Sequence, residues 1–272
     1  MPVSELHAQV ATIALGAAAG HGFALGGGNA LLAHGIITRR TEDVDLFTNR
    51  ETGVTAAAGG VEAALRAAGF EAERQNNTAG LADIFPGMGE GLAEWMVTAP
   101  GGEQMLLQMA YFDRGREPVV MDIGPVLDLE DVTGGKVCAL ASRAYERDYI
   151  DTAAALERYS PAQLIGFARQ LDPGLTSQDF ADVGQRLDQM PDEAFTGLGL
   201  SRQDVTLLRE RFAAWPRATE ASGREELAGH AAGEASTGQQ AVARPRAGAR
   251  RASPENVSRT ADAGEPEAEP EA

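Results

Sequence analysis

The stretch Gly26–Phe47, which reads GGGNALLAHGIITRRTEDVDLF, contains the two features that decide the fold. Its glycines follow the short apolar run FAL and precede an apolar segment, which predicts a strand that ends where a helix begins. Further on, Asp43 and Asp45 are two residues apart on a predicted strand, so their side chains share one face while Val44 and Leu46 point into a core. The stretch therefore predicts a two-faced strand beside a glycine turn.

The glycines and the acids together favour a nucleotide site. Backbone N–H groups at a glycine-rich helix start can face a phosphate, although GGGNAL matches neither the P-loop nor the GxGxxG pattern and could be a turn alone. Two neighbouring carboxylates repel each other unless a cation lies between them. Oxygen ligands at this spacing suit Mg²⁺ (or Mn²⁺) together with the phosphates of an NTP. The alternative is an exposed strand edge with two solvated acids.

Composition limits the function classes. The chain has 272 residues and one cysteine, Cys138, which excludes an internal disulfide framework and a cysteine-rich metal site. A net charge of −17 argues against a surface that binds nucleic acid all over, so any such contact must be local. No apolar run approaches the ~18 residues of a membrane span, and the N-terminus is expected to form a helix and not a signal peptide. We expect a cytoplasmic protein with no membrane partner.

The order of predicted elements indicates an α/β (α+β) fold. Residues 1–128 alternate helical patterns with apolar runs such as FEAER, EWMVTA, MLLQMAYF and PVVMDIG, which predicts a mixed sheet flanked by helices. Residues 129–216 have almost only helical patterns, which predicts a helical C-terminal domain. Residues 217–272 contain few large apolar side chains, and we expect them to form a disordered tail.

Two motifs resemble those of a known enzyme family. The series Gly27-Gly28-x-Ala30-Leu31, His34-Gly35 and Arg40-Thr41-x-Asp43-x-Asp45-Leu46-Phe47 is similar to the signature of the AbiEii/MenT-type nucleotidyltransferases. These are toxins of toxin–antitoxin systems within the DNA polymerase beta-like superfamily, whose nucleotidyltransferase fold the resemblance implies. The family's later motif, a lysine leading a helix followed by Arg-Asp and another Asp, resembles the set Lys136, Arg147, Asp148 and Asp151. The resemblance covers residues 23–156 approximately.

The resemblance implies a role for most motif residues. The phosphates of an NTP would lie over Gly27 and Gly28, assisted by Thr41 and Lys136, while Asp43 and Asp45 would hold the metal. Asp151 would orient Lys136 or position the acceptor, so the expected catalytic set is Asp43, Lys136, Asp151 and Thr41. The superfamily often has a third metal-binding acid on a later strand, for which Asp122, in a run that reads as a buried strand, is the candidate. Gly26 is expected to serve only the turn, and Asn29 falls in a variable position.

The resemblance also implies a substrate and a partner. Such enzymes transfer nucleotides to the 3′ end of tRNA, which blocks translation, and a neighbouring gene encodes an antitoxin. RNA or site support would come from Arg39, Arg40, Arg143 and Arg147, with Asp148 on the same helix face as Asp151. Two alternatives stay open. The first is an antibiotic-type nucleotidyltransferase with a small-molecule acceptor, which the acidic charge suits. The second is a non-catalytic nucleotide-binding or interaction protein.

Overall fold

One mixed sheet forms the N-terminal half of the protein. The computed structural model describes residues 3–75 and 91–217. Its seven strands lie in the order β3-β4-β5-β2-β1-β7-β6. They are β1 (Ala24–Leu25), β2 (Asp43–Thr48), β3 (Glu71–Arg74), β4 (Leu92–Thr98), β5 (Gln104–Tyr111), β6 (Val119–Met121) and β7 (Gly124–Val126). The acid-bearing strand β2 is thus at the centre of the sheet, parallel to β5 on one side and antiparallel to β1 on the other.

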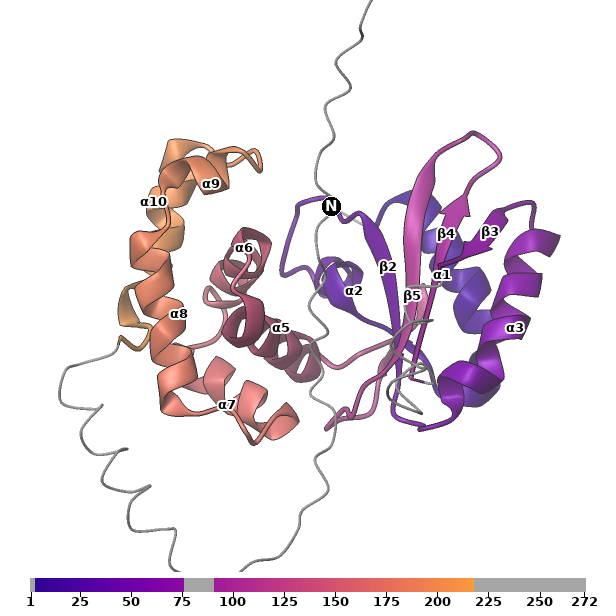
Figure 1. The fold of residues 1–272 in the computed structure, drawn as a ribbon, viewed down its shortest axis with the longest axis horizontal. Helices are drawn as coiled ribbons and strands as arrows, with labels where there is room; N and C mark the ends of the chain where they lie inside the picture. Colours follow the sequence, from indigo (N-terminus) through magenta and orange to yellow (C-terminus); the bar gives the residue numbers. More distant parts are fainter. Residues whose placement is uncertain (1–2, 76–90, 218–272) are drawn as a thin grey trace, which may run out of the picture.

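Long helices cover one face of the sheet, and a short helix lies on the other (Figure 1). The long helices α1 (Glu5–Ala17) and α3 (Gly53–Ala67) cover one face, with the short 3₁₀ helix η1 (Ala19–His21) after α1 (Figure 1). Between the sheet and the helical C-terminal part lies the short helix α2 (Gly27–Ala33), which starts directly after β1 (Figure 1). Small and branched side chains of α1 and α3 fill the core beneath the sheet. The other face of β2 is therefore the one toward the helical part.

The side chains of β2 alternate as its sequence predicts. Val44 and Leu46 are fully buried in the core, whereas Asp43 and Asp45 are only partly buried. Because successive side chains of a strand point to opposite faces, both acids project from the face opposite α1 and α3. The two-faced strand is confirmed, and it brings both carboxylates to the junction with the helices.

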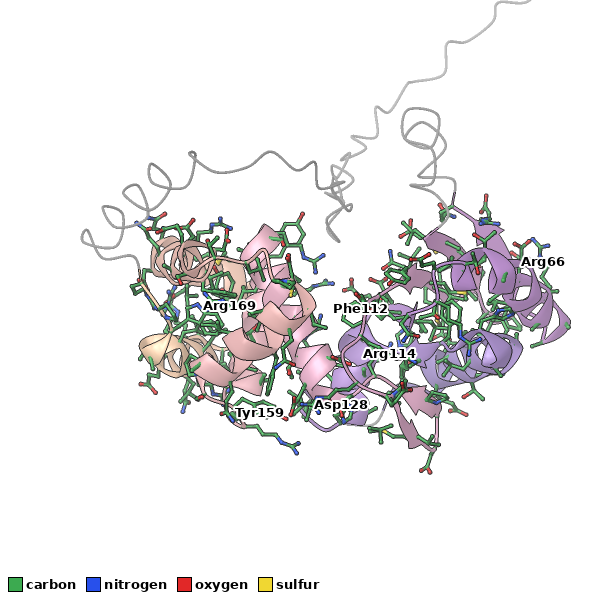
Figure 2. All side chains as sticks on the ribbon, turned by 90° about the horizontal axis from the view of Figure 1, so that it is seen from below. Arg66, Phe112, Arg114, Asp128, Tyr159 and Arg169 are labelled. Atoms are coloured by element: carbon green, nitrogen blue, oxygen red, sulfur yellow. The ribbon has the colours of Figure 1, made fainter. Side chains whose placement is uncertain are left out.

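Helices make up the C-terminal part. They are α5 (Leu129–Arg143), α6 (Glu146–Ala155), α7 (Pro161–Leu171), α8 (Ser177–Gln189), α9 (Asp192–Thr196), α10 (Arg202–Arg211) and the 3₁₀ helix η2 (Phe212–Ala214). Helix α5 belongs to both halves, because Leu129 and Val132 pack in the sheet core while Val137 packs in the helical core. Figure 2 shows Phe112 near this junction, and the ring of Phe112 would lie 3.8 Å from a Cβ placed on Gly135 of α5.

The mixed α/β class is confirmed, but one predicted strand is shorter than expected and exposed instead of buried. The run PVVMDIG forms two short strands, β6 and β7, joined by a turn that contains Asp122. Asp122 is exposed, and Val120 on the edge strand β6 is 82% exposed. A run of branched residues reads as buried, yet at the edge of a sheet it can face solvent.

Two further expectations concern the C-terminal tail and membrane-spanning helices. The structure extends to Arg217, whose guanidinium Nε lies 2.7 Å from Asp188 Oδ2, and the rest of the expected tail lies outside the described residues. Within 3–75 and 91–217, the helices lack the length and apolar character needed to cross a membrane.

Candidate active site

Each of the three glycines makes room for a side chain from the following segment. Gly27 has a φ of +56°, and a Cβ there would lie 1.8 Å from Asp45 Oδ2. A Cβ on Gly28 would lie 2.6 Å from Thr41 Cγ2, and one on Gly26 would lie 2.2 Å from the Phe47 ring. A side chain at any of the three positions would therefore force its neighbour to shift, and Gly26, expected to serve only the turn, also makes room for Phe47.

Asn29 holds the segment that leads into β2. Its side chain is fully buried, its Nδ2 donates to the backbone oxygen of Asp43 at 2.7 Å, and its Oδ1 accepts from Thr41 Oγ1 at 2.7 Å. Asn29 falls in a variable position of the motif, yet in this chain it has a structural role that a lone Asn in an apolar helix signals, because buried polar groups need partners. Since the Thr41 hydroxyl already donates to Asn29, its hydrogen would have to rotate away to reach a phosphate.

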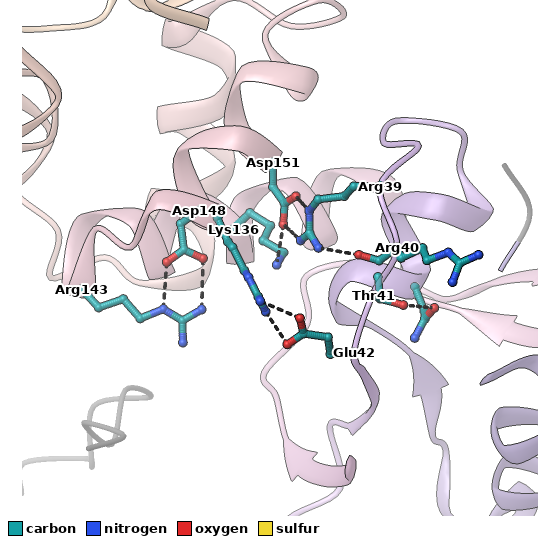
Figure 3. Close-up of polar contacts among 10 residues, drawn as sticks. Arg39, Arg40, Thr41, Glu42, Lys136, Arg143, Asp148 and Asp151 are labelled. Carbon is teal, nitrogen blue, oxygen red and sulfur yellow. Dashed lines mark hydrogen bonds and ion pairs between the residues drawn. The ribbon is translucent and has the colours of Figure 1, made fainter. Parts of the chain in front are cut away.

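Asp151 is the buried centre of an ion cluster that joins the two halves of the protein (Figure 3). Arg39 donates through Nε to Oδ1 and through a terminal nitrogen to Oδ2, both at 2.7 Å. Lys136 Nζ lies 2.8 Å from Oδ2. Burial favours a higher pKa for Asp151, but Lys136 and Arg39 outweigh it and hold the pKa below its usual value. The carboxylate therefore stays ionised and fixes both cations.

The other acids of α6 and its neighbours have different partners. Asp148 is buried and accepts two bonds from Arg143, at 2.8 and 3.0 Å, and not from the residues around Asp151 (Figure 3). Arg147 forms a two-point pair with Glu42, at 2.6 and 2.7 Å, directly before β2. Helix α6 therefore contacts the segment before β2 through Asp151 and Arg147, whereas its Asp148 binds Arg143.

Both arginines interact electrostatically with the acid pair of β2. The pKa of Arg143 is raised chiefly by its bond to Asp148, and Asp45 adds to the shift. The pKa of Arg147 is raised chiefly by Glu42, with contributions from Asp43. Two arginines from the helical half thus contribute positive potential at the carboxylates of β2.

Sequence reasoning also missed His7, on α1. Burial lowers its pKa, while the backbone of Glu42 and the charge of Asp43 act in the opposite direction. The imidazole of His7 therefore lies beside the start of β2. A lone histidine early in the chain carries no signal of this neighbourhood, because only the packing of α1 against the sheet creates it.

Asp122 and Arg40 do not join this cluster. β2 runs antiparallel to β1 while β7 runs parallel to β1, so the β6–β7 turn lies at the end of the sheet opposite Asp43. The expected third acid is therefore misplaced as a partner of Asp43 and Asp45. Arg40 is exposed, and its guanidinium points away from Asp151 (Figure 3).

The acid pair fits a cation that brings other ligands with it. Among the described residues, no group of three or more His, Cys, Asp or Glu side chains is arranged to hold a metal. Asp43 and Asp45 nevertheless share one face of β2, and the missing Cβ of Gly27 gives Asp45 Oδ2 its place. Mg²⁺ commonly takes one or two carboxylates and completes its shell with water and phosphate. The donor set therefore suits a metal that is held jointly with a nucleotide.

Comparison with known proteins agrees with this geometry. A family model described as the nucleotidyl transferase AbiEii toxin of a type IV toxin–antitoxin system matches residues 14–214. No curated protein matches the chain. The crystal structure of JHP933 from Helicobacter pylori is 16% identical with a TM-score of 0.50, and the match covers 85% of this chain and 98% of that one.

Two more solved structures are similar to the chain. A candidate nucleotidyltransferase from H. pylori is 15% identical with a TM-score of 0.50, covering 77% of this chain and 94% of that one. MenT4, a nucleotidyltransferase toxin from Mycobacterium tuberculosis H37Rv, is 14% identical with a TM-score of 0.47, covering 80% and 86%. The H. pylori likenesses show the nucleotidyltransferase fold, and the family model covers most of the chain. The protein therefore belongs to the AbiEii nucleotidyl transferase toxin family and is a nucleotidyltransferase.

Proposed function

We propose that this protein transfers a nucleotide from an NTP to the 3′ end of tRNA, with Mg²⁺ or Mn²⁺ as the cofactor. In this role it would block translation, as the toxin paired with an antitoxin from a neighbouring gene. The observation that carries the proposal is the close approach of Gly27 to Asp45 beside the Arg39–Asp151–Lys136 cluster. The glycine turn, the acid pair and a lysine held by Asp151 thus come together at the junction of the two halves, where a Cβ on Gly28 would lie 3.7 Å from an Arg39 nitrogen.

Different residues of the chain would bind the phosphates, hold the metal and keep the site in position. The first N–H groups of a helix lack intrahelical acceptors, so Gly27 and Gly28 offer donors to the phosphates. Lys136, held by Asp151 at 2.8 Å, neutralises phosphate charge from the side of α5. Asp43 and Asp45 would hold the metal, which supplies positive charge to the phosphate oxygens when bound. Asn29 keeps Thr41 and the start of β2 in register with the glycine turn.

A small-molecule acceptor is the second candidate, and one observation favours it. Three of the four site arginines are already paired with carboxylates: Arg39 with Asp151, Arg143 with Asp148, and Arg147 with Glu42. Pairing reduces the positive potential that RNA phosphates need, whereas an acidic surface suits a cationic aminoglycoside. Family membership favours an enzyme over the non-catalytic alternative.

The transfer assay supplies the test. The full chain is incubated with Mg²⁺ or Mn²⁺, each labelled NTP in turn, and either tRNA or an aminoglycoside. We expect label on the 3′ end of tRNA and a loss of at least about a hundredfold in Asp43→Asn, because the metal would lose a ligand. Label on the aminoglycoside alone would establish the second candidate, and equal labelling by Asp43→Asn would refute the assigned metal site.

Gly27→Ala tests the glycine turn separately from backbone strain. Its Cβ would overlap Asp45 Oδ2, so we expect transfer to fall at least about tenfold as the carboxylate is displaced. The matched control is Gly102→Ala, since Gly102 also has a positive φ, +87°, but has open space around it. Equal activity in the two variants would show that the contact with Asp45 is unimportant.

A further inference from the structure

Three polar side chains lie in register across the centre of the sheet. Asp45 on β2 pairs with Gln108 on β5, and Gln108 pairs with Glu94 on β4. Directly paired residues of neighbouring strands have their side chains on the same face. The Gln108 amide and the Glu94 carboxylate therefore form a row that crosses the sheet from Asp45, on the face opposite α1 and α3.

Glu94 fixes the orientation of the Gln108 amide. Gln108 Nε2 donates to Glu94 Oε1 at 2.8 Å, and Glu94 is only 5% exposed whereas Gln108 is half-buried. A carboxylate accepts hydrogen bonds, so the amide nitrogen must face Glu94 and the amide oxygen must lie on the other side of the group. Gln108 Oε1 is thus the atom of this amide that can accept a hydrogen bond, on the residue directly paired with Asp45.

In-line chemistry places the acceptor of the reaction over this strand. This step rests on the proposed function, in which the triphosphate lies over Gly27 and Gly28. Those glycines follow β1, on one side of β2, while β5 lies on the other side. The attacking oxygen must approach the α-phosphorus opposite the departing pyrophosphate. On that arrangement the end of the acceptor would approach from the side of β5, where Gln108 is paired with Asp45.

We propose that Gln108 Oε1 accepts a hydrogen bond from the 2′-hydroxyl of the acceptor's terminal ribose, with Glu94 as its positioning residue. Neighbouring strands are about 4.8 Å apart, so a side chain one strand away from the acid pair can reach the hydroxyl adjacent to the attacking 3′-oxygen. The 3′-oxygen forms a bond to the α-phosphorus, pyrophosphate leaves with the electrons of the broken P–O bond, and the hydroxyl proton passes to water. This contact selects RNA ends over DNA ends.

The test compares two tRNAs that differ only in the terminal sugar. One ends in adenosine and the other in 2′-deoxyadenosine, and both keep the 3′-hydroxyl. We expect the full-length enzyme to use the ribose end about tenfold better in kcat/KM, the worth of one hydrogen bond. Gln108→Met should lower the use of the ribose end to the level of the deoxy end, so that the ratio of the two kcat/KM values falls to about one. In Glu94→Gln the new side chain can either donate or accept, so it no longer fixes the orientation of the Gln108 amide. This variant should give an intermediate ratio.

The control is Gln178→Met in α8, where Gln178 Nε2 donates to Asp182 Oδ1 at 2.6 Å in the helical part. This variant removes the same kind of hydrogen bond, and its ratio of kcat/KM for the ribose end to kcat/KM for the deoxy end should equal that of the unmodified enzyme. A ratio of one in the unmodified enzyme, or an unchanged ratio in Gln108→Met, would overturn the inference. So would an equal loss with both acceptors, which indicates a structural role. Transfer to neither tRNA would overturn the proposed function itself, and with it this contact.

Discussion

Two ion-paired links join the segment before β2 to helix α6, and they differ in burial far more than in length. In the first, Asp151 is fully buried between Arg39 and Lys136, with contacts of 2.7 and 2.8 Å. In the second, Arg147 and Glu42 approach to 2.6 Å, but their side chains are 46% and 65% exposed. Distance alone would rank the two links as equals. Exposed pairs contribute little because water and salt screen them, whereas a buried charge that loses its partner is costly.

The largest expected effect comes from Asp151→Asn. The variant leaves Arg39 and Lys136 facing each other without the buried carboxylate, so we expect the free energy of unfolding to fall by about 3 kcal/mol. Transfer activity should fall as well, because Lys136 loses the group that orients it. Urea unfolding followed by fluorescence and circular dichroism measures the change. A loss below about 1 kcal/mol would mean that the buried link contributes no more to stability than the exposed one, which would contradict the role given to burial.

A pH series sharpens the assignment to Asp151. Its pKa is lower in the folded protein than the ordinary value of about 3.9, so its contribution is present above that value and is lost as the pH falls through the folded pKa. The difference in unfolding free energy between the unmodified protein and Asp151→Asn should thus be constant from pH 7 to about 5 and shrink below about 4. Other acids titrate in both proteins and largely cancel. A difference that shrinks already near pH 6 would contradict a depressed pKa.

The smallest effect is expected for Arg147→Gln, at about 0.5 kcal/mol or less. Its pair with Glu42 lies largely in water, and 1 M salt should reduce even this contribution. The measurement is the same urea titration at low and high salt, with Glu42→Gln as the reciprocal variant. A loss comparable to that of Asp151→Asn would mean that exposure does not separate the two links.

Part of the fold and the site could be predicted from local pattern alone. The alternation in DVDLF predicts a two-faced strand, and burial of Val44 and Leu46 confirms it. The same reasoning failed for PVVMDIG, because hydrophobicity does not reveal whether a strand is central or at an edge. The contacts of Gly26 and Asn29 could not be predicted for a related reason. Their constraints come from Phe47, Thr41 and Asp43, whose approach depends on how the chain returns.

The sequence by itself determined the alternation of β2, the glycine turn before α2 and the change from sheet to helices, because each follows from the chemistry of neighbouring residues. The tertiary structure decided which charges meet. Asp151 binds Arg39 across 112 positions, and Arg147 binds Glu42 across 105. It also decided that Asp122 lies at the far end of the sheet and that Gln108 lies beside Asp45. Local propensities act over a few residues, whereas these contacts depend on strand order and on how α5 and α6 pack against the sheet.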